Sequence, residues 1–296
     1  MTLILTAMDS TKIVQVGDQR LTLDGRPYDD HAVKSIFMKS RDAAARVSYT
    51  GRAFIGPRRT RTDFWLCDNL QERAELPFPE LTQSLAQRLS AVDMAGDPLT
   101  IVLAAYADGT SWSVFCLLSN AHDAQGKELS KPVKEFSALY RMPSDNPKSA
   151  PPVLHTAGYE AALTRPARRT LRRFLGKRFQ AASPSGCAEL LMRSIREASR
   201  QSKLVGSNCI GIALVPGRDA EGFYWPEKAD APVQLTPHIV TQSSVYRTGY
   251  VSRGLDSPSP HDPIRGLAAT ESRNRAERRV RHGHKCEHRR LAKCSA

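Results

Sequence analysis

The 296-residue sequence predicts an α+β fold in which antiparallel sheets and helices occupy separate parts of the chain. Three observations favour this fold class. Short β-prone runs follow one another as hairpin-like neighbours, apolar residues at helical spacing are confined to two pairs of segments, and strands do not alternate regularly with helices. The order is strands, two helices, strands, two helices and a final strand. This order favours antiparallel sheets with segregated helices over a doubly wound parallel sheet.

The strands are expected where β-prone runs are bounded by polar turn residues. The first two runs flank the polar turn Asp9-Ser10-Thr11, and Asp108-Gly109 is a turn signal between two later runs. The polar, proline-containing stretch 120–152 predicts a long loop with one short strand. The expected strands are Leu3–Met8, Lys12–Val16, Ala32–Met38, Ala45–Tyr49, Thr100–Tyr106, Ser111–Leu118, Val153–Thr156 and Cys209–Val215.

The four helices are expected where apolar residues recur every three or four positions. Thr62 is expected to cap the first helix, and the second begins near Glu80, with Leu81, Leu85 and Leu89 on one face. The third spans about residues 160–175. The fourth begins at Ser183-Pro184, a capping residue followed by proline at the first helical position.

The net charge of +13 is concentrated toward the carboxyl end. Residues 237–296 contain 12 Lys and Arg but only 5 Asp and Glu, and they include few apolar residues. We therefore expect one folded domain over residues 1–236 and a basic, disordered tail over residues 237–296. The body is only mildly basic, which indicates little about its partners.

The tail also contains His282, His284, His288, Cys286 and Cys294. Their spacing lacks the paired cysteines of familiar zinc sites, so no metal ion is expected. A solvated tail is favoured, and contact with nucleic acid or an acidic partner is the alternative. Base stacking is not expected, because no aromatic residue lies among the basic ones after Tyr250.

The sequence contains neither an apolar stretch long enough to span a membrane nor a secretory signal, so a cytoplasmic protein without membrane contact is expected. Six cysteines do not predict a disulfide framework. Cys67, Cys116, Cys187 and Cys209 lie singly in apolar stretches, where a free thiol behaves as a small buried hydrophobe.

Polar residues near the amino end form the main candidate site. Lys34 lies in the apolar run Ala32-Val33-Lys34-Ser35-Ile36-Phe37, so its ammonium is expected to be partly buried and to need a partner. Asp18 is the obvious partner. A purely structural ion pair, or a lysine on the solvent face of an alternating strand, are the alternatives.

Thr2 gives this pair a chemical interpretation. Removal of Met1 would leave Thr2 with a free α-amine, so one residue would carry both a nucleophilic oxygen and a base with an ordinary pKa near about 8. A neighbouring Lys34 ammonium would favour the neutral, proton-accepting amine, and Asp18 would hold the lysine in place. With no propeptide before Thr2, maturation is expected to need only removal of Met1.

The spacing of Thr2, Asp18, Arg20 and Lys34 resembles that of the proteasome β-type subunits, which belong to the N-terminal nucleophile hydrolase superfamily. The segment Asp18-Gln19-Arg20-Leu21-Thr22 resembles their Asp-x-Arg-x-Thr segment, and Ser48-Tyr49-Thr50-Gly51 resembles the one that contains their oxyanion-hole glycine. The resemblance implies a four-layer αββα sandwich, with two antiparallel sheets between helical layers.

The resemblance also implies the roles of single residues. Thr2 would be the nucleophile with its own amine as base, Lys34 would lower the pKa of that amine, and Asp18 would fix the lysine. Arg20 would support the cluster, and the Gly51 N–H would stabilise the oxyanion. One departure stands out: the family carries a Gly-Ser-Gly segment where this chain has His155-Thr156-Ala157-Gly158-Tyr159, without a serine.

We therefore expect an N-terminal-threonine hydrolase that acts on a peptide or amide substrate without a cofactor, as a stand-alone relative outside a barrel assembly. A homo-oligomer is compatible with the sequence. The alternative is a catalytically inactive interaction module of the same fold, whose basic tail binds nucleic acid or an acidic partner.

Overall fold

A computed structural model describes residues 2–23, 25–56, 59–94, 96–107, 113–141, 151–228, 233–247 and 250–252. The chain divides into two units, Met1–Ser257 and Pro258–Ala296, and all described residues belong to the first.

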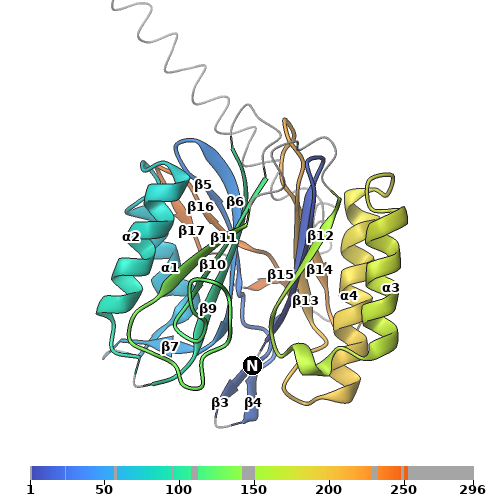
Figure 1. The fold of residues 1–296 in the computed structure, drawn as a ribbon, viewed down its shortest axis with the longest axis horizontal. Coiled ribbons are helices and arrows are strands. Elements are labelled where there is room, and N and C mark those ends of the chain that lie inside the picture. Colours follow the sequence, from blue (N-terminus) through green and yellow to red (C-terminus); the bar gives the residue numbers. More distant parts are fainter. Residues whose placement is uncertain are drawn as a thin grey trace, which may run out of the picture. The chain divides into compact units, whose positions relative to one another are not determined.

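The first large sheet has five strands in the order β12-β1-β2-β13-β14, and all neighbours are antiparallel. Its strands β12, β13 and β14 are labelled in Figure 1. β1 and β2 are buried along their whole length and are mostly apolar, and the polar Thr6 and Gln15 within them are hydrogen-bonded to each other. The register pairs Leu3 with Gly158 and Asp18 with Cys209, so the start of β1 and the end of β2 lie at the same end of the sheet. The strands are β1 (Leu3–Met8), β2 (Ile13–Asp18), β12 (Val153–Gly158), β13 (Cys209–Leu214) and β14 (Glu221–Trp225).

The second large sheet has seven strands in the order β11-β10-β9-β6-β5-β16-β17. Its neighbours are antiparallel except for β16, which pairs with β5 in parallel. The strands are β5 (Ser35–Lys39), β6 (Ala43–Gly51), β9 (Leu99–Ala107), β10 (Ser113–Ser119), β11 (Ser137–Arg141), β16 (His238–Val240) and β17 (Val245–Tyr246).

Three two-stranded sheets complete the described strands. They pair β3 (Leu21–Leu23) with β4 (Arg26–Asp29), β7 (Phe54–Ile55) with β8 (Thr60–Arg61), and β15 (Val233–Leu235) with β18 (Tyr250–Ser252).

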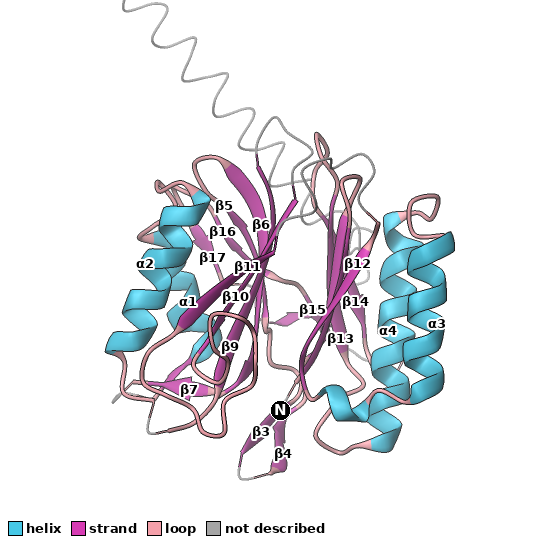
Figure 2. Cartoon of the chain, in the orientation of Figure 1, coloured by secondary structure: helices cyan, strands magenta, loops and turns pink. Residues whose placement is uncertain are grey.

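Each large sheet packs against its own pair of helices (Figure 2). The seven-stranded sheet shares a core with α1 (Thr62–Gln71) and α2 (Phe78–Ala91), and the five-stranded sheet shares one with α3 (Arg165–Lys177) and α4 (Pro184–Gln201). The four cysteines at positions 67, 116, 187 and 209 are buried in these two cores as free thiols.

The helix starts test the expected caps. Ser183 caps α4 as expected, because its Oγ accepts a hydrogen bond from the N–H of Gly186. Thr62 does not cap α1: it is the first helical residue, and its hydroxyl donates to the carbonyl of Arg52 instead. A short 3₁₀ turn, Glu160–Ala162, occupies the expected start of the third helix.

The expected four-layer sandwich of two antiparallel sheets is wrong. The described strands divide into five sheets, and the largest contains a parallel pair. All eight expected strands overlap observed ones, and β11 lies in the stretch where one short strand was expected. The strands that were not expected are β3, β4, β7, β8, β14, β15, β16, β17 and β18. These strands are short or lie in polar sequence, where periodicity carries little signal.

The prediction that the chain is disordered from residue 237 onward is also corrected at the start of that segment. His238–Val240 forms β16 and is buried, because β16 packs beside β5 and against α1. The His238 imidazole lies 3.3 Å from the carboxylate of buried Asp63. The disorder expected beyond residue 252, and the histidine and cysteine cluster there, lie outside the described residues. No helix in the described part of the chain is long and apolar enough to cross a membrane.

Candidate active site

The main chain of Thr2 is held on two sides immediately before β1. Its carbonyl oxygen accepts hydrogen bonds from the N–H of Tyr159 (2.9 Å) and from the hydroxyl of Thr50 (3.2 Å). Gly158 makes this approach possible, because its φ is +89° and a Cβ there would lie 1.7 Å from the Thr2 carbonyl oxygen. Thr2 is 3% exposed. The main chain of Thr2 is therefore fixed by contacts from β6 and from the residue that follows β12.

Asp18 ends β2 and is completely buried. Its Oδ2 accepts the N–H of Leu3 (2.6 Å), and its Oδ1 accepts the N–H groups of Arg20 (2.9 Å) and Gly206 (3.1 Å). The pKa of Asp18 is raised by burial, although the ammonium of Lys34 and these three amides oppose that change. Both oxygens act as acceptors from the backbone, so the geometry is that of an ionised carboxylate.

Lys34 lies one residue before β5 and is 2% exposed. Its Nζ donates to Thr2 Oγ1 and to the carbonyl oxygen of Arg20, and it lies 4.0 Å from Asp18 Oδ1. The N–H of Lys34 donates to the Gln19 side-chain oxygen at 3.0 Å, which fixes the backbone at this point. Burial lowers the pKa of Lys34 from 10.5 to about 8, and the Asp18 carboxylate opposes that change.

Arg20 joins the cluster through its main chain rather than through its side chain. Its N–H binds Asp18 and its carbonyl accepts from Lys34, while its guanidinium pairs with Asp30 and donates to the carbonyl of Lys203 at 2.9 Å. The hydrogen bond to Asp30 raises the pKa of Arg20.

Gly51 ends β6 and follows Thr50, the residue that binds the Thr2 carbonyl. Its φ is +105°, and a Cβ at this position would lie 2.2 Å from the Pro98 carbonyl oxygen, which explains why glycine is needed here.

The structure thus brings together Thr2, Asp18, Lys34 and the backbone of Arg20, and it places Gly51 one residue from a Thr2 contact. The alternative of a solvent-facing lysine is wrong, because Lys34 is buried. Sequence reasoning missed the Gly206 amide and the Thr50 hydroxyl. Gly206 had a local signal, since it lies in the loop before β13, but its contact with Asp18 joins residues 188 positions apart in the chain.

Two other features lie apart from this cluster. Arg46 is fully buried between the two large sheets, where it donates to the carbonyls of Gln15 and Ile210 and to the hydroxyl of Ser35. Burial lowers the pKa of Arg46 to about 9. Among the described residues, no group of three or more His, Cys, Asp or Glu side chains is placed to hold a metal ion.

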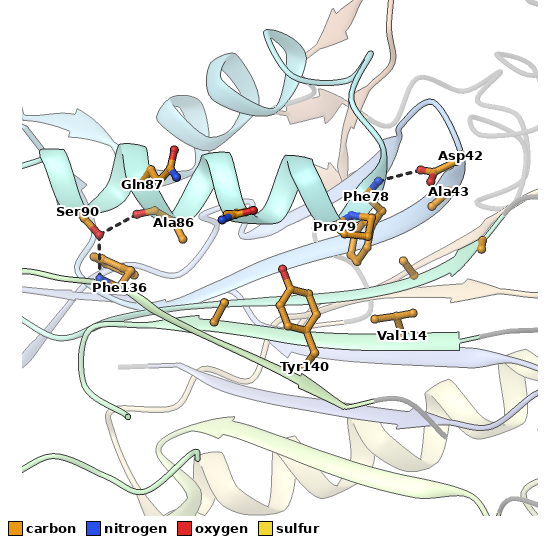
Figure 3. A pocket seen from close by; sticks show the side chains of 14 residues that line it. Asp42, Ala43, Phe78, Pro79, Ala86, Gln87, Ser90, Val114, Phe136 and Tyr140 are labelled. Atoms are coloured by element: carbon orange, nitrogen blue, oxygen red, sulfur yellow. Dashed lines mark hydrogen bonds between the residues drawn. The ribbon is translucent and has the colours of Figure 1, made fainter. Parts of the chain in front are cut away.

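The second feature is an apolar pocket of about 970 Å³ between α2 and the β10–β11 side of the seven-stranded sheet (Figure 3). Several of its polar groups already have partners: Asp42 accepts from the N–H of Phe78, and Ser90 donates to the Ala86 carbonyl and accepts from the N–H of Phe136. None of the residues of the Thr2 cluster lines it. We therefore place the candidate chemistry at Thr2 and not in this pocket.

Comparison with known proteins does not assign the chain to a family. No family model matches it, and no curated protein matches it. Similar solved structures include Anbu (ancestral beta-subunit) from Yersinia bercovieri, with 10% identity and a TM-score of 0.47 over 78% of this chain and 89% of that one. An Anbu mutant from Hyphomicrobium sp. strain MC1 also has 10% identity and a TM-score of 0.47, over 95% and 97% of the two chains. At these values the likeness carries no argument, and the expected assignment to the proteasome β-type subunits is corrected: the chain is left without a family.

Proposed function

We propose that this protein is a hydrolase of amide or peptide bonds whose nucleophile is Thr2 Oγ1, active after the peptide bond before Thr2 has been cleaved. The observation that carries the proposal is the contact between Lys34 Nζ and Thr2 Oγ1 inside a buried cluster that also contains the Asp18 carboxylate. A hydroxyl, a lysine with a lowered pKa and a fixed carboxylate are the groups that nucleophilic catalysis requires.

In the proposed reaction, Thr2 Oγ1 attacks the substrate carbonyl carbon and its proton passes to a neutral nitrogen. Two nitrogens are available: the α-amine released by cleavage, and Lys34 Nζ. A Lys34 pKa of about 8 leaves roughly one lysine in ten neutral at pH 7 and able to accept the proton, whereas the α-amine route does not need a neutral lysine. The nitrogen then returns the proton to the departing amine, and an ester to Thr2 remains.

Water completes the cycle by cleaving the ester, which regenerates the hydroxyl and releases the acid. The negative charge on the substrate oxygen needs a donor, and we assign this role to the Gly51 N–H because Gly51 adjoins the Thr50–Thr2 contact. Asp18 acts as a positioning residue: it holds Lys34 and, through the N–H of Leu3, the first residue of β1.

One observation favours the non-catalytic alternative. The segment that adjoins Thr2 from β12 offers no serine hydroxyl, and the hydroxyl of Thr156 in that segment already donates to Glu160. The released amine would therefore depend on Lys34, without a hydroxyl from β12 to bind it.

Intact-mass measurement of the purified protein, followed by labelling with a β-lactone probe for N-terminal threonine, tests the proposal. We expect the mature protein to begin at Thr2 and to gain one probe per chain. Thr2→Ala should abolish labelling, Thr2→Ser should retain it, and Thr6→Ala is the matched control, because Thr6 is a buried threonine of β1 whose hydroxyl binds Gln15.

The role of the lysine is tested in the same assay with a second matched pair. Lys34→Met should slow labelling by at least about tenfold, a typical lower range for loss of a proton acceptor. Lys12→Met removes another buried lysine, which lies at the end of β2 that is remote from Asp18, and should leave labelling unchanged. Two results would reject the hydrolase and favour the non-catalytic module. The first is a purified protein that still carries the residue before Thr2, and the second is a Thr2→Ala variant that is labelled as well as the wild type.

A further inference from the structure

The exposed face of α3 is a row of cations without partners among the described residues. Its basic side chains point away from the core, while Ala167, Leu171 and Leu175 on the opposite face are buried. Arg168 differs from the others, because its guanidinium donates to the main-chain carbonyls of Glu160 and Leu163. We define the α3 basic face as the exposed Arg165, Arg169, Arg172, Arg173 and Lys177 of α3 together with Arg178, the residue that follows the helix.

Helix stability explains Lys177 and Arg178 at the carboxyl end of α3, where cations suit the helix dipole, but it does not explain the arginines that precede them. Arg165 and Arg169, like Arg169 and Arg173, are four residues apart, where like charges destabilise a helix. The first turn of α3 contains no acidic residue, and Arg165 lies at the positive end of the helix dipole. The neighbouring helix α4 has the opposite arrangement, with Glu189 and Arg193 in an i,i+4 ion pair. The α3 basic face is therefore better explained by an external anion than by folding.

The side chains indicate which anion fits. Five of the six are arginines, whose planar guanidinium binds phosphate oxygens in a bidentate manner. The exposed positions of α3 carry no large apolar side chain that could insert into a lipid surface and no aromatic ring on which an unpaired base could stack. Phe174 is partly buried and packs against the core. The arginines and the absence of exposed apolar or aromatic side chains favour a phosphate backbone whose bases stay stacked inside a duplex.

The dimensions agree with a duplex. From Arg165 to Lys177 the helix rises by about 18 Å at 1.5 Å per residue, a length that corresponds to about five base pairs of double-stranded DNA. The arginines in the first half of the row border a shallow hollow of about 770 Å³. We propose that the α3 basic face is a docking surface for the phosphate backbone of double-stranded nucleic acid, without sequence selectivity. This role is independent of the proposed hydrolase.

Fluorescence anisotropy with two labelled 20-base-pair DNA duplexes of unrelated sequence tests the proposal, on the full chain and over 50 to 200 mM KCl. We expect both duplexes to bind equally and the logarithm of the affinity to fall linearly with the logarithm of the salt concentration. The variant Arg169→Gln/Arg172→Gln/Arg173→Gln should bind at least about tenfold more weakly at 100 mM KCl and should reduce the salt slope by about 2 to 3.

The matched control is Lys39→Gln/Arg41→Gln/Arg218→Gln, which removes the same charge from exposed positions outside α3 and should change affinity less than twofold. The conservative variant with lysine at positions 169, 172 and 173 keeps the charge and should retain most of the salt slope. If the α3 glutamine and control variants lose affinity equally, or the full chain binds no duplex at 50 mM KCl, the proposal is overturned. Stronger competition by polyglutamate or by anionic lipid vesicles than by unlabelled duplex would overturn it in favour of an acidic protein or a membrane surface.

Discussion

The lowered pKa of Lys34 makes a quantitative prediction about the stability of the folded protein. Burial lowers the pKa of Lys34 from 10.5 to about 8, so between these two pH values an unfolded chain keeps a proton that the folded chain has released. The unfolded state then binds more protons, and stability rises with pH across this window. The gap corresponds to about 3 kcal/mol at 1.36 kcal/mol per pH unit.

The test compares wild type with Lys34→Met, which keeps an unbranched chain but has no titrating group. Urea unfolding followed by tryptophan fluorescence at pH values from 7 to 10.5 gives the free energy of unfolding of each protein. We expect the wild-type value to rise relative to Lys34→Met by about 3 kcal/mol over this range. In Asp18→Asn the rise should begin at lower pH, because loss of the carboxylate lowers the Lys34 pKa further.

A difference that stays flat, or that falls as the pH rises, would refute the reasoning. It would mean that the attraction of Asp18 outweighs burial and keeps the lysine protonated. Lys34 could then not accept the Thr2 proton, and the released α-amine would be the only base left in the proposed reaction.

The remaining predictions concern coupling, backbone geometry and the corrected start of the tail. Asp18→Asn alone should destabilise the protein by about 3 to 5 kcal/mol, because it leaves Lys34 as an unpaired buried charge. In urea unfolding, the double variant Asp18→Asn/Lys34→Met should lose less stability than the sum of the losses of the two single variants. Gly158→Ala should lower stability by at least about 1 to 3 kcal/mol and slow labelling of Thr2, because a Cβ at this positive φ cannot fit beside the Thr2 carbonyl. The control Gly176→Ala, in α3, should be neutral or stabilising. Truncation after Pro237 should lower the free energy of unfolding by about 3 to 6 kcal/mol, because it removes the buried strand β16, whereas truncation after Ser252 should not. Equal stability of the two truncated chains would contradict the placement of β16.

Sequence periodicity predicted the elements whose signal is local. The apolar run at the start of β1, that of β13, and the spacing of Leu81, Leu85 and Leu89 in α2 could be recognised from sequence. Burial on both faces of a strand, or on one face of a helix, leaves a pattern within a few residues. β16 left no such pattern: three residues in a polar stretch become a strand only because the edge of β5 is open to pair with them. A fold class built on antiparallel neighbours could not anticipate that parallel pairing.

The candidate site shows the same division between local and distant information. A lysine inside the run from Ala32 to Phe37 predicted burial and an acidic partner, and the structure places Asp18 beside it. The spacing of these residues did not reveal what holds Asp18. Its carboxylate is fixed by amides from Leu3, Arg20 and Gly206, and the last of these lies 188 residues away along the chain. Such a contact follows from the pairing of β13 with β2, which no local pattern encodes.

These contacts also indicate how the site would become active. The carbonyl of Thr2 is held by Thr50 and Tyr159, and the next N–H, that of Leu3, is held by Asp18. All three bonds lie on the carboxyl side of the Thr2 Cα, so cleavage of the bond before Thr2 would break none of them. Lys34 already contacts Oγ1, so the hydroxyl would not need to move. On the proposed function, maturation therefore adds one amine to a site that is otherwise preorganised, and the folded chain supplies the alignment that an efficient nucleophile requires.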